Sequence, residues 1–395
     1  MSRDAGVRVC RNGGALVLAF AVILASGCAG TADDATSTKD PEGAVTRPAA
    51  PEGELSAELQ DQLRSALDQV MGEYDVPGAA AGVWIPGQGS WTTAAGVADL
   101  DGDVPVTVDM TWPIRSITKS YTVTLLLQLV DEGEISLDDT IDQYVDGITD
   151  GDTITLLELA NMSSGNADYI SQEFLDDFSA DPTKIYSIGE LNSFIVGEPA
   201  QFAPGTEYIY TNANTNLLGA VIEKVTGKEY AEVLDERILT PLGQTGTAYV
   251  TDPADWRVPH AVGYIAAEGV REAQTETPSI LGAAGAMFST LDDGRVWAET
   301  LGTGALLTPD TQKLRLIGHP IPRPPYDEYA VGIGETGGWW GHNGEGIGFT
   351  AATFHDPDSG ASIVVYMNES NIPEAHPADA AFRAFAAVLD MSAGG

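Results

Sequence analysis

Ser116 and Lys119 stand three residues apart, directly before a largely apolar stretch from Val123 to Val130. Side chains at this spacing share one face of a helix. The stretch that follows is hydrophobic on all sides, which predicts that the helix is buried. A lysine at the start of a buried helix is unfavourable unless its amine has a chemical role. A serine nucleophile activated by a lysine base supplies one.

Strand-like stretches occur at both ends of the folded region, with mostly helices and loops between them. These stretches are 79–85, 91–98, 284–289, 328–334, 346–354 and 361–367. Helices are expected at about 55–71 and at about 377–389. We therefore predict an α+β fold in which N- and C-terminal strands build one antiparallel sheet, flanked by the terminal helices, with a mostly helical insert at about 137–281. A site between sheet and insert is expected.

The first 27 residues are typical of an export signal. Basic residues precede a short apolar run at 15–25, and small residues precede Cys28. The end of this segment is similar to a bacterial lipoprotein signal, in which the cysteine is acylated; the alternative is an ordinary cleaved signal. Residues 28–54 are predicted to be a disordered tether, followed by the folded domain at 55–395. We expect a lipid-anchored protein on the outer side of the bacterial cytoplasmic membrane, or a secreted one.

The chain is strongly acidic, with 19 Lys and Arg against 58 Asp and Glu and a net charge of −39. This balance argues against nucleic-acid binding and against adhesion to anionic lipid heads, so membrane contact is expected only through the lipid anchor. The acidity predicts a solvated surface, or alternatively the steering of a basic ligand. Both cysteines lie near the N-terminus, which excludes a disulfide framework and a Cys-based zinc site further along. No metal or cofactor is expected.

Tyr210 and Asn212 form a second candidate element. A phenol near the nucleophile can relay a proton to a leaving group, and an asparagine amide can hold a substrate carbonyl. Residues 366–368 have the same spacing but lie in an apolar strand, so packing explains them better. Residues 164–166 offer a serine in place of the phenol. We prefer Tyr210 because Pro and Gly at 204–205 place it on a loop before a helix.

His342 and Gly344 form the third candidate element, in a glycine-rich stretch from 341 to 348. Glycine permits a close backbone approach to a substrate lying along a strand. The alternative is a turn histidine between two strands. No second ligand stands at zinc spacing from His342, which argues against a metal site.

The three elements, in this order, resemble the serine β-lactamase and penicillin-binding protein superfamily. The resemblance is to the class C β-lactamase and D-Ala-D-Ala carboxypeptidase branch, where Tyr-x-Asn is the second motif and Lys-Thr-Gly or His-x-Gly the third. Stretches at 156–169, 241–243 and 284–293 are also similar to that family. The resemblance covers roughly residues 55 to 390.

The resemblance implies a role for each motif residue. Ser116 would attack a carbonyl and form an acyl-enzyme, while Lys119 and Tyr210 would take and return protons. The substrate-binding residues would be Asn212, His342, Gly344 and Glu345. His342 would lie beside the nucleophile on the sheet edge. The backbone N–H groups of Ser116 and Glu345 would form the oxyanion hole.

A histidine in the third motif favours D,D-peptidases, D-aminopeptidases and esterases over β-lactamases. The expected protein is an exported serine hydrolase that acts on a peptidoglycan stem peptide or an ester, most like a penicillin-binding D-Ala-D-Ala carboxypeptidase. An esterase or β-lactamase of the same fold is the alternative. A non-catalytic surface binding protein on this fold is an alternative of another class. The Glu345 carboxylate would repel an anionic substrate, which weighs against the peptidase interpretation.

Overall fold

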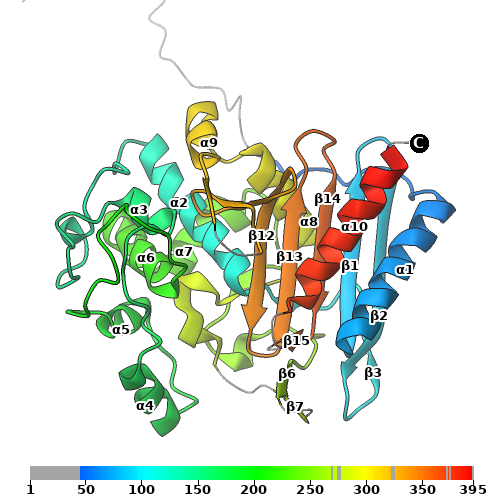
Figure 1. Ribbon diagram of the computed structural model, residues 1–395, viewed down its shortest axis with the longest axis horizontal. Coiled ribbons are helices and arrows are strands. Elements are labelled where there is room, and N and C mark those ends of the chain that lie inside the picture. Colours follow the sequence, from blue (N-terminus) through cyan, green and yellow to red (C-terminus); the bar gives the residue numbers. More distant parts are fainter. Residues whose placement is uncertain are drawn as a thin grey trace, which may run out of the picture. The chain divides into compact units, whose positions relative to one another are not determined.

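The computed structural model of the chain describes residues 45–267, 270–273, 277–321, 325–370, 372 and 375–393. Within these residues the largest sheet has nine strands in the order β3-β2-β1-β14-β13-β12-β11-β10-β9 (Figure 1). Neighbouring strands in this sheet are antiparallel. The strands are β1 (Gly78–Ile85), β2 (Gly89–Asp99), β3 (Val104–Pro105), β9 (His319–Pro320), β10 (Glu328–Tyr329), β11 (Gly334–Thr336), β12 (Trp339–Gly346), β13 (Phe349–His355) and β14 (Ser362–Met367).

The sheet joins the two ends of the chain through the pairing of β1 with β14. This pairing runs from Ala79 opposite Met367 to Trp84 opposite Ser362. Both strands are buried along their whole length, which suits the small and β-branched residues they contain. The predicted α+β fold, with one antiparallel sheet shared by early and late strands, is confirmed.

Two terminal helices cover one face of this sheet. The helices α1 (Ala57–Tyr74) and α10 (Pro377–Ala393) lie side by side there (Figure 1). Ser56 caps α1 by accepting a hydrogen bond from the Leu59 backbone, and the helix ends at Asp75 in a left-handed conformation. Its apolar stripe, which includes Leu63 and Leu67, faces the sheet.

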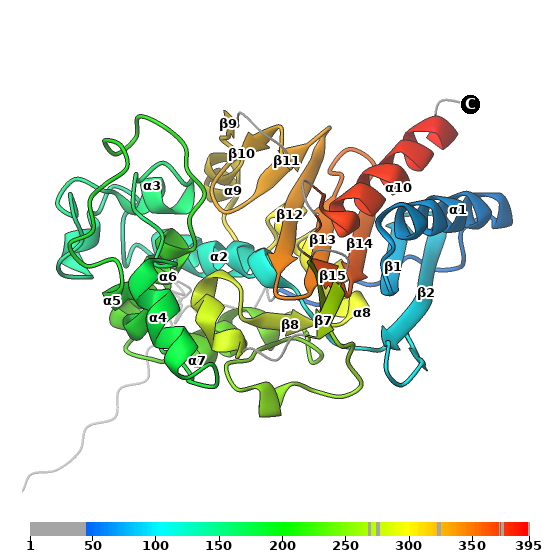
Figure 2. The same cartoon turned by 60° about the horizontal axis from the view of Figure 1, so that its bottom comes forward.

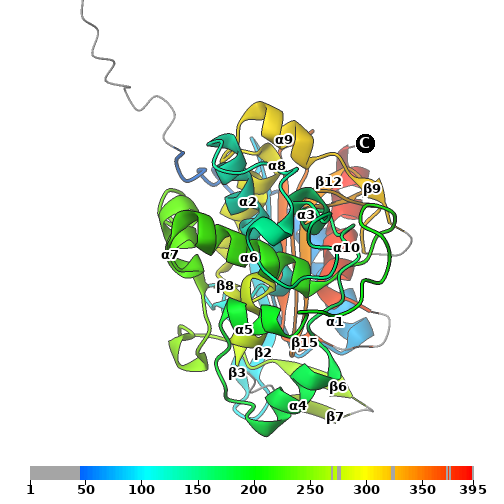
Figure 3. The ribbon, with the colours of Figure 1, turned by 90° about the vertical axis from the view of Figure 1, so that its left-hand side faces the viewer.

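The other face of the sheet carries α8 (Leu291–Thr303), and the remaining helices extend beyond it. The helix α2 (Thr118–Asp131) lies between the sheet and most of these helices (Figures 2 and 3). The remaining helices are α3 (Leu156–Ala160), α4 (Gln172–Ala180), α5 (Ile188–Ser193), α6 (Asn212–Thr226), α7 (Tyr230–Leu234) and α9 (Pro309–Arg315). The stacked rings of Tyr121 and Trp297, 3.5 Å apart at their centres, join α2 to α8.

Short strands, 3₁₀ turns and one π-helical turn, η3, complete the described part of the chain. The strands are β4 (Trp112–Pro113), β5 (Ala248–Tyr249), β6 (Tyr264–Ala267), β7 (Val270–Ala273), β8 (Met287–Ser289) and β15 (Glu369–Ser370). The turns are η1 (Arg115–Ile117), η2 (Ile141–Gln143), η3 (Asp235–Leu239), η4 (Pro253–Asp255) and η5 (Pro278–Ala284). The predicted helical insert therefore also contains the two-stranded hairpin of β6 and β7.

The strand β12 was missing from the predicted set, although it carries the third motif. Its sequence contains three glycines, at 341, 344 and 346, which disfavour a strand by propensity. Pairing with β13 along its length overrides that preference. Pairing with β11 stops at Gly341, so residues 342–346 have a strand on one side only. The other side faces η1, the turn that carries Ser116.

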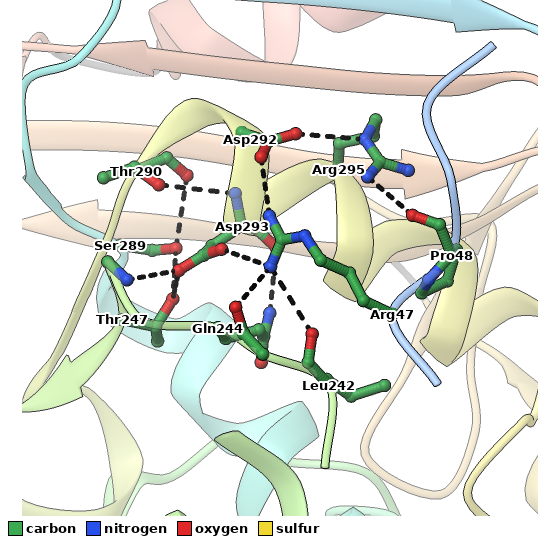
Figure 4. Close-up of polar contacts among 12 residues, drawn as sticks. Arg47, Pro48, Leu242, Gln244, Thr247, Ser289, Thr290, Asp292, Asp293 and Arg295 are labelled. Atoms are coloured by element: carbon green, nitrogen blue, oxygen red, sulfur yellow. Dashed lines mark hydrogen bonds and ion pairs between the residues drawn. The ribbon is translucent and has the colours of Figure 1, made fainter. Parts of the chain in front are cut away.

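The segment from residue 45 to 54 lies against the folded domain, although we predicted it as part of the disordered tether. The Arg47 guanidinium donates to the Gly243 carbonyl at 2.7 Å and pairs with Asp292 at 2.6 Å and Asp293 at 2.8 Å (Figure 4). Arg295 donates to the Pro48 carbonyl at 2.9 Å. Charge-assisted contacts to residues about 245 positions away hold this segment in place.

The predicted signal peptide, Cys28 and the first part of the tether lie outside the described residues, and so does Arg323. Lipidation and export therefore stay predictions. Among the helices of the described ranges, none combines the length and the hydropathy that a membrane span requires.

Candidate active site

Ser116 and Lys119 meet at the junction of η1 and α2. Ser116 lies on the 3₁₀ turn and Lys119 in the first turn of the helix that follows, so the spacing of three brings them together as predicted. Lys119 Nζ lies 3.0 Å from Ser116 Oγ. The lysine is completely buried, with 0 % of its surface exposed. A buried amine without a carboxylate in hydrogen-bond contact is poised to lose its charge.

Two further hydrogen-bond partners determine the charge state of Lys119. Its Nζ donates to Asn212 Oδ1 at 2.8 Å and to the Ala284 carbonyl at 2.9 Å. Burial lowers the pKa of Lys119 to about 7, and the charge of Asp168 opposes the shift. Both oxygens can only accept, so they take the two hydrogens of a neutral amine. The nitrogen lone pair is then left for the third partner, the Ser116 hydroxyl, which can donate.

Tyr210 lies on the loop directly before α6, with its ring against Lys119. The Nζ atom is 4.8 Å from the ring centre. Burial raises the pKa of Tyr210, while a hydrogen bond with the Ser116 side chain acts to lower it. The phenol is therefore protonated and in contact with the nucleophile. The predicted trio of Ser116, Lys119 and Tyr210 comes together in one place.

The two rivals of Tyr210 lie elsewhere. Ser164 is completely buried and donates to Asn214 Oδ1 at 2.8 Å, which makes it part of the packing between α3 and α6. Tyr366 lies in β14 with its ring 6.2 Å from that of Trp112, in the hydrophobic core. Neither residue lines the cavity beside Ser116.

Asn212 is held from both sides, by Asp168 and by Lys119. Its backbone N–H and its Nδ2 both donate to Asp168 Oδ2, at 3.0 and 3.4 Å. With Nδ2 directed at this carboxylate, Oδ1 is turned toward Lys119. Asp168 therefore fixes which end of the Asn212 amide faces the lysine, a role that the sequence did not reveal.

His342 is completely buried, and its side chain does not line the cavity. Its Nδ1 lies 2.6 Å from the Asn343 carbonyl and 3.0 Å from the Tyr326 hydroxyl. Its Nε2 lies 3.2 Å from the Tyr329 hydroxyl. Because a carbonyl only accepts, Nδ1 carries the proton and Nε2 accepts from Tyr329. We expected His342 to contact substrate, but the structure places it behind the cavity wall.

Burial keeps His342 neutral, since it lowers the pKa of the imidazole to about 3. The ring lies 6.3 Å from the ring of Tyr210, so His342 supports the phenol from behind. Side chains alternate along a strand, and the β12 side chains that reach the cavity are those of Asn343 and Glu345. Asn343 Oδ1 accepts from the Tyr326 hydroxyl at 2.6 Å.

Gly344 is the point where β12 approaches the nucleophile. A Cβ atom at this position would stand 2.3 Å from the Ile114 carbonyl oxygen and 3.1 Å from the Ser116 backbone nitrogen. Only glycine allows this contact between strand and turn. The backbone of Glu345 follows immediately, which is compatible with an oxyanion hole shared by the Ser116 and Glu345 N–H groups.

A cavity of about 1160 Å³ opens in front of Ser116. Its reactive end is formed by Ser116, Tyr210 and Asn212. The far wall is apolar and includes Ile170, Phe174, Leu175, Phe178, Ile280 and Leu281. Such a mixture of an apolar wall and a few polar groups is typical of a small-molecule site.

A carboxylate and an imidazole face each other on this cavity. The Nδ1 atom of His376, which precedes α10, lies 2.7 Å from Glu345 Oε2. The Glu345 contact raises the pKa of His376, and burial acts in the opposite direction. Sequence reasoning identified Glu345 but missed His376, because the two residues are 31 positions apart in the sequence, with three strands between them.

The described residues contain no group of three or more His, Cys, Asp or Glu side chains that could hold a metal ion. At its reactive end the cavity brings together the hydroxyl of Ser116, the amine of Lys119 and the phenol of Tyr210. These groups suit a nucleophilic attack on a carbonyl followed by proton transfer.

A family model described as Beta-lactamase matches residues 63–388 of the chain. The chain belongs to the beta-lactamase family. The matched range of this beta-lactamase family domain includes the sheet, α2 and the helical insert. The predicted resemblance of the three motifs to the serine β-lactamase and penicillin-binding protein superfamily is therefore confirmed. The motif residues Ser116, Lys119, Tyr210, Asn212, His342 and Gly344 all lie within the matched range.

Three proteins illustrate what this beta-lactamase family chain is similar to. A D-aminopeptidase of Brucella anthropi is 28% identical over 316 residues, which are 78% of the chain and 59% of that protein. A D-stereospecific amidohydrolase from Streptomyces sp. has a TM-score of 0.71 with 28% identity over 79% of the chain and 94% of its own. A D-amino acid amidase from Ochrobactrum anthropi SV3, complexed with L-phenylalanine amide, has a TM-score of 0.73 with 25% identity, over 86% of the chain and 99% of its own.

The chain spans about three fifths of the length of the D-aminopeptidase that it matches. The solved amidase and amidohydrolase structures, in contrast, are covered almost completely. The similarity of this beta-lactamase family chain therefore concerns the domain that it shares with these relatives, which are named as a D-aminopeptidase, a D-stereospecific amidohydrolase and a D-amino acid amidase.

Proposed function

We propose that the chain is a serine hydrolase that forms an acyl-enzyme on Ser116. The observation that carries this proposal is the buried Lys119 amine, 3.0 Å from Ser116 Oγ, with two acceptor oxygens as its other partners. A base is most effective when its pKa lies near the working pH, and burial lowers the pKa of Lys119 to about 7.

The reaction begins when neutral Lys119 takes the hydroxyl proton of Ser116 and Oγ attacks the substrate carbonyl carbon. The tetrahedral oxyanion is held by backbone N–H groups at the junction of η1 and β12. Collapse breaks the bond to the leaving group, which receives a proton from Tyr210; Lys119 returns its proton to the phenol. Water then attacks the ester on Ser116, and its proton passes back through Tyr210 and Lys119 to Oγ.

The substrates that we propose are amides of D-amino acids or the N-terminal residues of D-peptides. The similarity to a D-aminopeptidase, a D-stereospecific amidohydrolase and a D-amino acid amidase supports this class. The Glu345 carboxylate on the cavity wall supports it over a D-Ala-D-Ala carboxypeptidase, whose substrate ends in a carboxylate that Glu345 would repel.

The apolar wall of the cavity favours an esterase as a second candidate. Ile170 and Leu175 are 48% and 43% exposed, so an apolar acyl chain would cover surface that is otherwise in water. Esters react more readily than amides on the same nucleophile, and the two activities are compatible within one site.

Intact-mass spectrometry of the acylated protein tests these proposals together. The donors are D- and L-phenylalanine amide, a D-Ala-D-Ala peptide, a penicillin and a short acyl ester. We expect an adduct at Ser116 with D-phenylalanine amide and little with its L enantiomer. The matched controls are Ser116→Ala, which should form none, and Ser164→Ala, which should behave as the wild type.

An adduct with the D-Ala-D-Ala peptide and the penicillin alone would replace the amidase proposal with the carboxypeptidase. An adduct with the ester alone would favour the esterase. If no donor and no fluorophosphonate probe labelled Ser116, the chain would be a non-catalytic binding protein on this fold.

We also propose that the protein is exported and carries a lipid on Cys28. The basic, apolar and small segments of residues 1–28 support this location. Cell fractionation tests it: the wild type should be found with the membrane, and Cys28→Ser should be released or retained unprocessed. Recovery of the wild type in the soluble fraction without a lipid would contradict the proposal.

A further inference from the structure

Glu345 is the one carboxylate among the described residues that line the cavity. Its side chain is 27% exposed, although the strand around it is largely buried. The lining also contains the Arg115 guanidinium, which donates to the Ile347 carbonyl at 2.8 Å and is 4% exposed as a residue. Glu345 and His376 are therefore the exposed ionisable side chains on this part of the wall.

The position of Glu345 relative to Ser116 is fixed by the backbone. The preceding residue, Gly344, packs against the Ser116 backbone nitrogen, so Glu345 begins where the acyl carbonyl has to lie. The Glu345 side chain lines the same cavity as Ser116, so its carboxylate can meet a group that flanks this carbonyl. In an amino acid amide, the nearest of these atoms that carries a charge is the α-nitrogen.

His376 holds the carboxylate in place. Its Nδ1 lies 2.7 Å from Oε2, and the His376 side chain is itself 41% exposed on the same cavity. The Glu345 side chain nevertheless stays 27% exposed at the cavity, so a ligand can reach it. A held carboxylate loses less side-chain entropy when it binds a ligand.

We propose that Glu345, held by His376, is the subsite that binds the α-ammonium group of the acyl donor. This subsite rests on the proposed function, since it names the part of the substrate that such a hydrolase would recognise. An ammonium beside a carboxylate forms a charge-assisted hydrogen bond, whereas a substrate carboxylate at the same place is repelled.

The apolar wall of the cavity indicates which side chain the ligand carries. Phe174 and Phe178 on α4 have stacked rings 6.1 Å apart, and the exposed Leu175 lies between them in sequence. A side chain attached to the same α-carbon would leave the polar end of the cavity and cover these residues. The preferred donor is therefore an amide with a free α-amino group and a large apolar side chain.

Binding to the inactive full-length Ser116→Ala protein tests this subsite without requiring turnover. The ligands are D-phenylalanine amide and 3-phenylpropanamide, which lacks the α-amino group and is otherwise the same. Calorimetry should show about tenfold tighter binding of the ammonium ligand, as expected for one charge-assisted hydrogen bond. In Ser116→Ala/Glu345→Gln this preference should fall to about twofold or less.

A matched control separates this effect from a general loss of negative charge. Glu328 lies in the same sheet, on β10, and does not line the cavity. Ser116→Ala/Glu328→Gln should keep the tenfold preference. Ser116→Ala/Glu345→Lys should reverse it, and bind the monoamide of benzylmalonic acid, in which a carboxylate replaces the ammonium, more tightly than D-phenylalanine amide. Thermal melting of each variant confirms that it is folded.

Equal binding of the two ligands to the Ser116→Ala protein would overturn the subsite, as would a preference that survives Glu345→Gln. Failure of the proposed function has a different signature. The wild type would then form no acyl-enzyme with any donor, whatever the binding preference of the Ser116→Ala protein.

Discussion

Two buried basic side chains flank Tyr210, Lys119 from α2 and His342 from β12. Both have 0 % of their surface exposed, and burial lowers the pKa of both. The pKa of Lys119 falls to about 7, and that of His342 to about 3. The lysine therefore changes its charge within the physiological range, whereas the imidazole stays neutral throughout it.

The difference between these regions comes from the partners of each base. Lys119 has two acceptor oxygens and the Ser116 hydroxyl, so its lone pair is directed at a proton that can move. His342 stands between the hydroxyls of Tyr326 and Tyr329, 3.0 and 3.2 Å away, and touches no nucleophile. Burial alone does not make a catalytic base; contact with the reacting group does. The β12 region thus holds Tyr210 in position, whereas the α2 region carries the nucleophile and its base.

The largest effect that separates the two regions is expected for Lys119→Met. Loss of the base should lower kcat by about 10²–10⁴-fold, the usual contribution of a general base. Lys119→Arg should be almost as inactive, because a guanidinium stays charged and cannot accept the Ser116 proton. Single-turnover acylation measures both variants. Substantial activity in Lys119→Arg would show that the positive charge, and not the base, is what matters.

Gly344→Ala, a substitution in the backbone contact of β12, should lower kcat by about 10²-fold. The added methyl group would stand 2.3 Å from the Ile114 carbonyl oxygen, so the turn that carries Ser116 has to move. The matched control is Gly338→Ala, since Gly338 has no atom within 4 Å of an added Cβ, although its positive φ adds local strain. Comparison of kcat for the two variants tests whether β12 acts through its backbone.

A smaller loss, of about tenfold in kcat, is expected for His342→Gln, because neutral hydrogen bonds to two tyrosines are weakened. The informative readout is the pH profile. The acid limb of kcat/KM should keep its midpoint at about pH 7, since Lys119 and not His342 titrates there. A limb that disappears in His342→Gln would identify the imidazole as the titrating base.

The smallest change in rate, a loss of a few fold, is expected for Asp168→Asn, which disturbs the Asn212 amide. The charge of Asp168 raises the pKa of Lys119, so its removal lowers that pKa. Lys119 is then neutral down to a lower pH, and the acid limb of kcat/KM should move to lower pH. The exposed Asp68→Asn on α1 should leave the limb in place. A limb that moves to higher pH would contradict the assigned role.

Local patterns, together with the resemblance of the three motifs to a known superfamily, predicted Ser116, Lys119 and Tyr210 as one site, and the structure places the three side chains together. A spacing of three places serine and lysine on one helical face, and a Pro-Gly loop places the tyrosine before a helix. Asp168 and His376 stayed hidden, because they act only through side chains 44 and 31 residues away. The side-chain direction of His342 also could not be predicted, since β12 itself was not predicted as a strand.

In the fold, too, local patterns predicted some elements, whereas contacts between distant residues stayed hidden. Capping residues and apolar periodicity located α1, and the apolar run at 362–366 located β14. Arg47 lies in a segment poor in apolar residues, which predicted disorder. This segment is held in place by Asp292 and Asp293, far along the chain, and no local sequence pattern predicts such a contact.

The rate of Ser116 modification by a fluorophosphonate, measured between about pH 5 and 9, tests the central claim most directly. The probe reports the nucleophile and its base without any assumption about the natural substrate. We predict labelling at Ser116 that rises with pH and has a midpoint at about pH 7, the pKa of the buried Lys119. A rate that does not change over this range, or one that is still rising steeply at about pH 9 as the ordinary lysine pKa of 10.5 requires, would contradict the account.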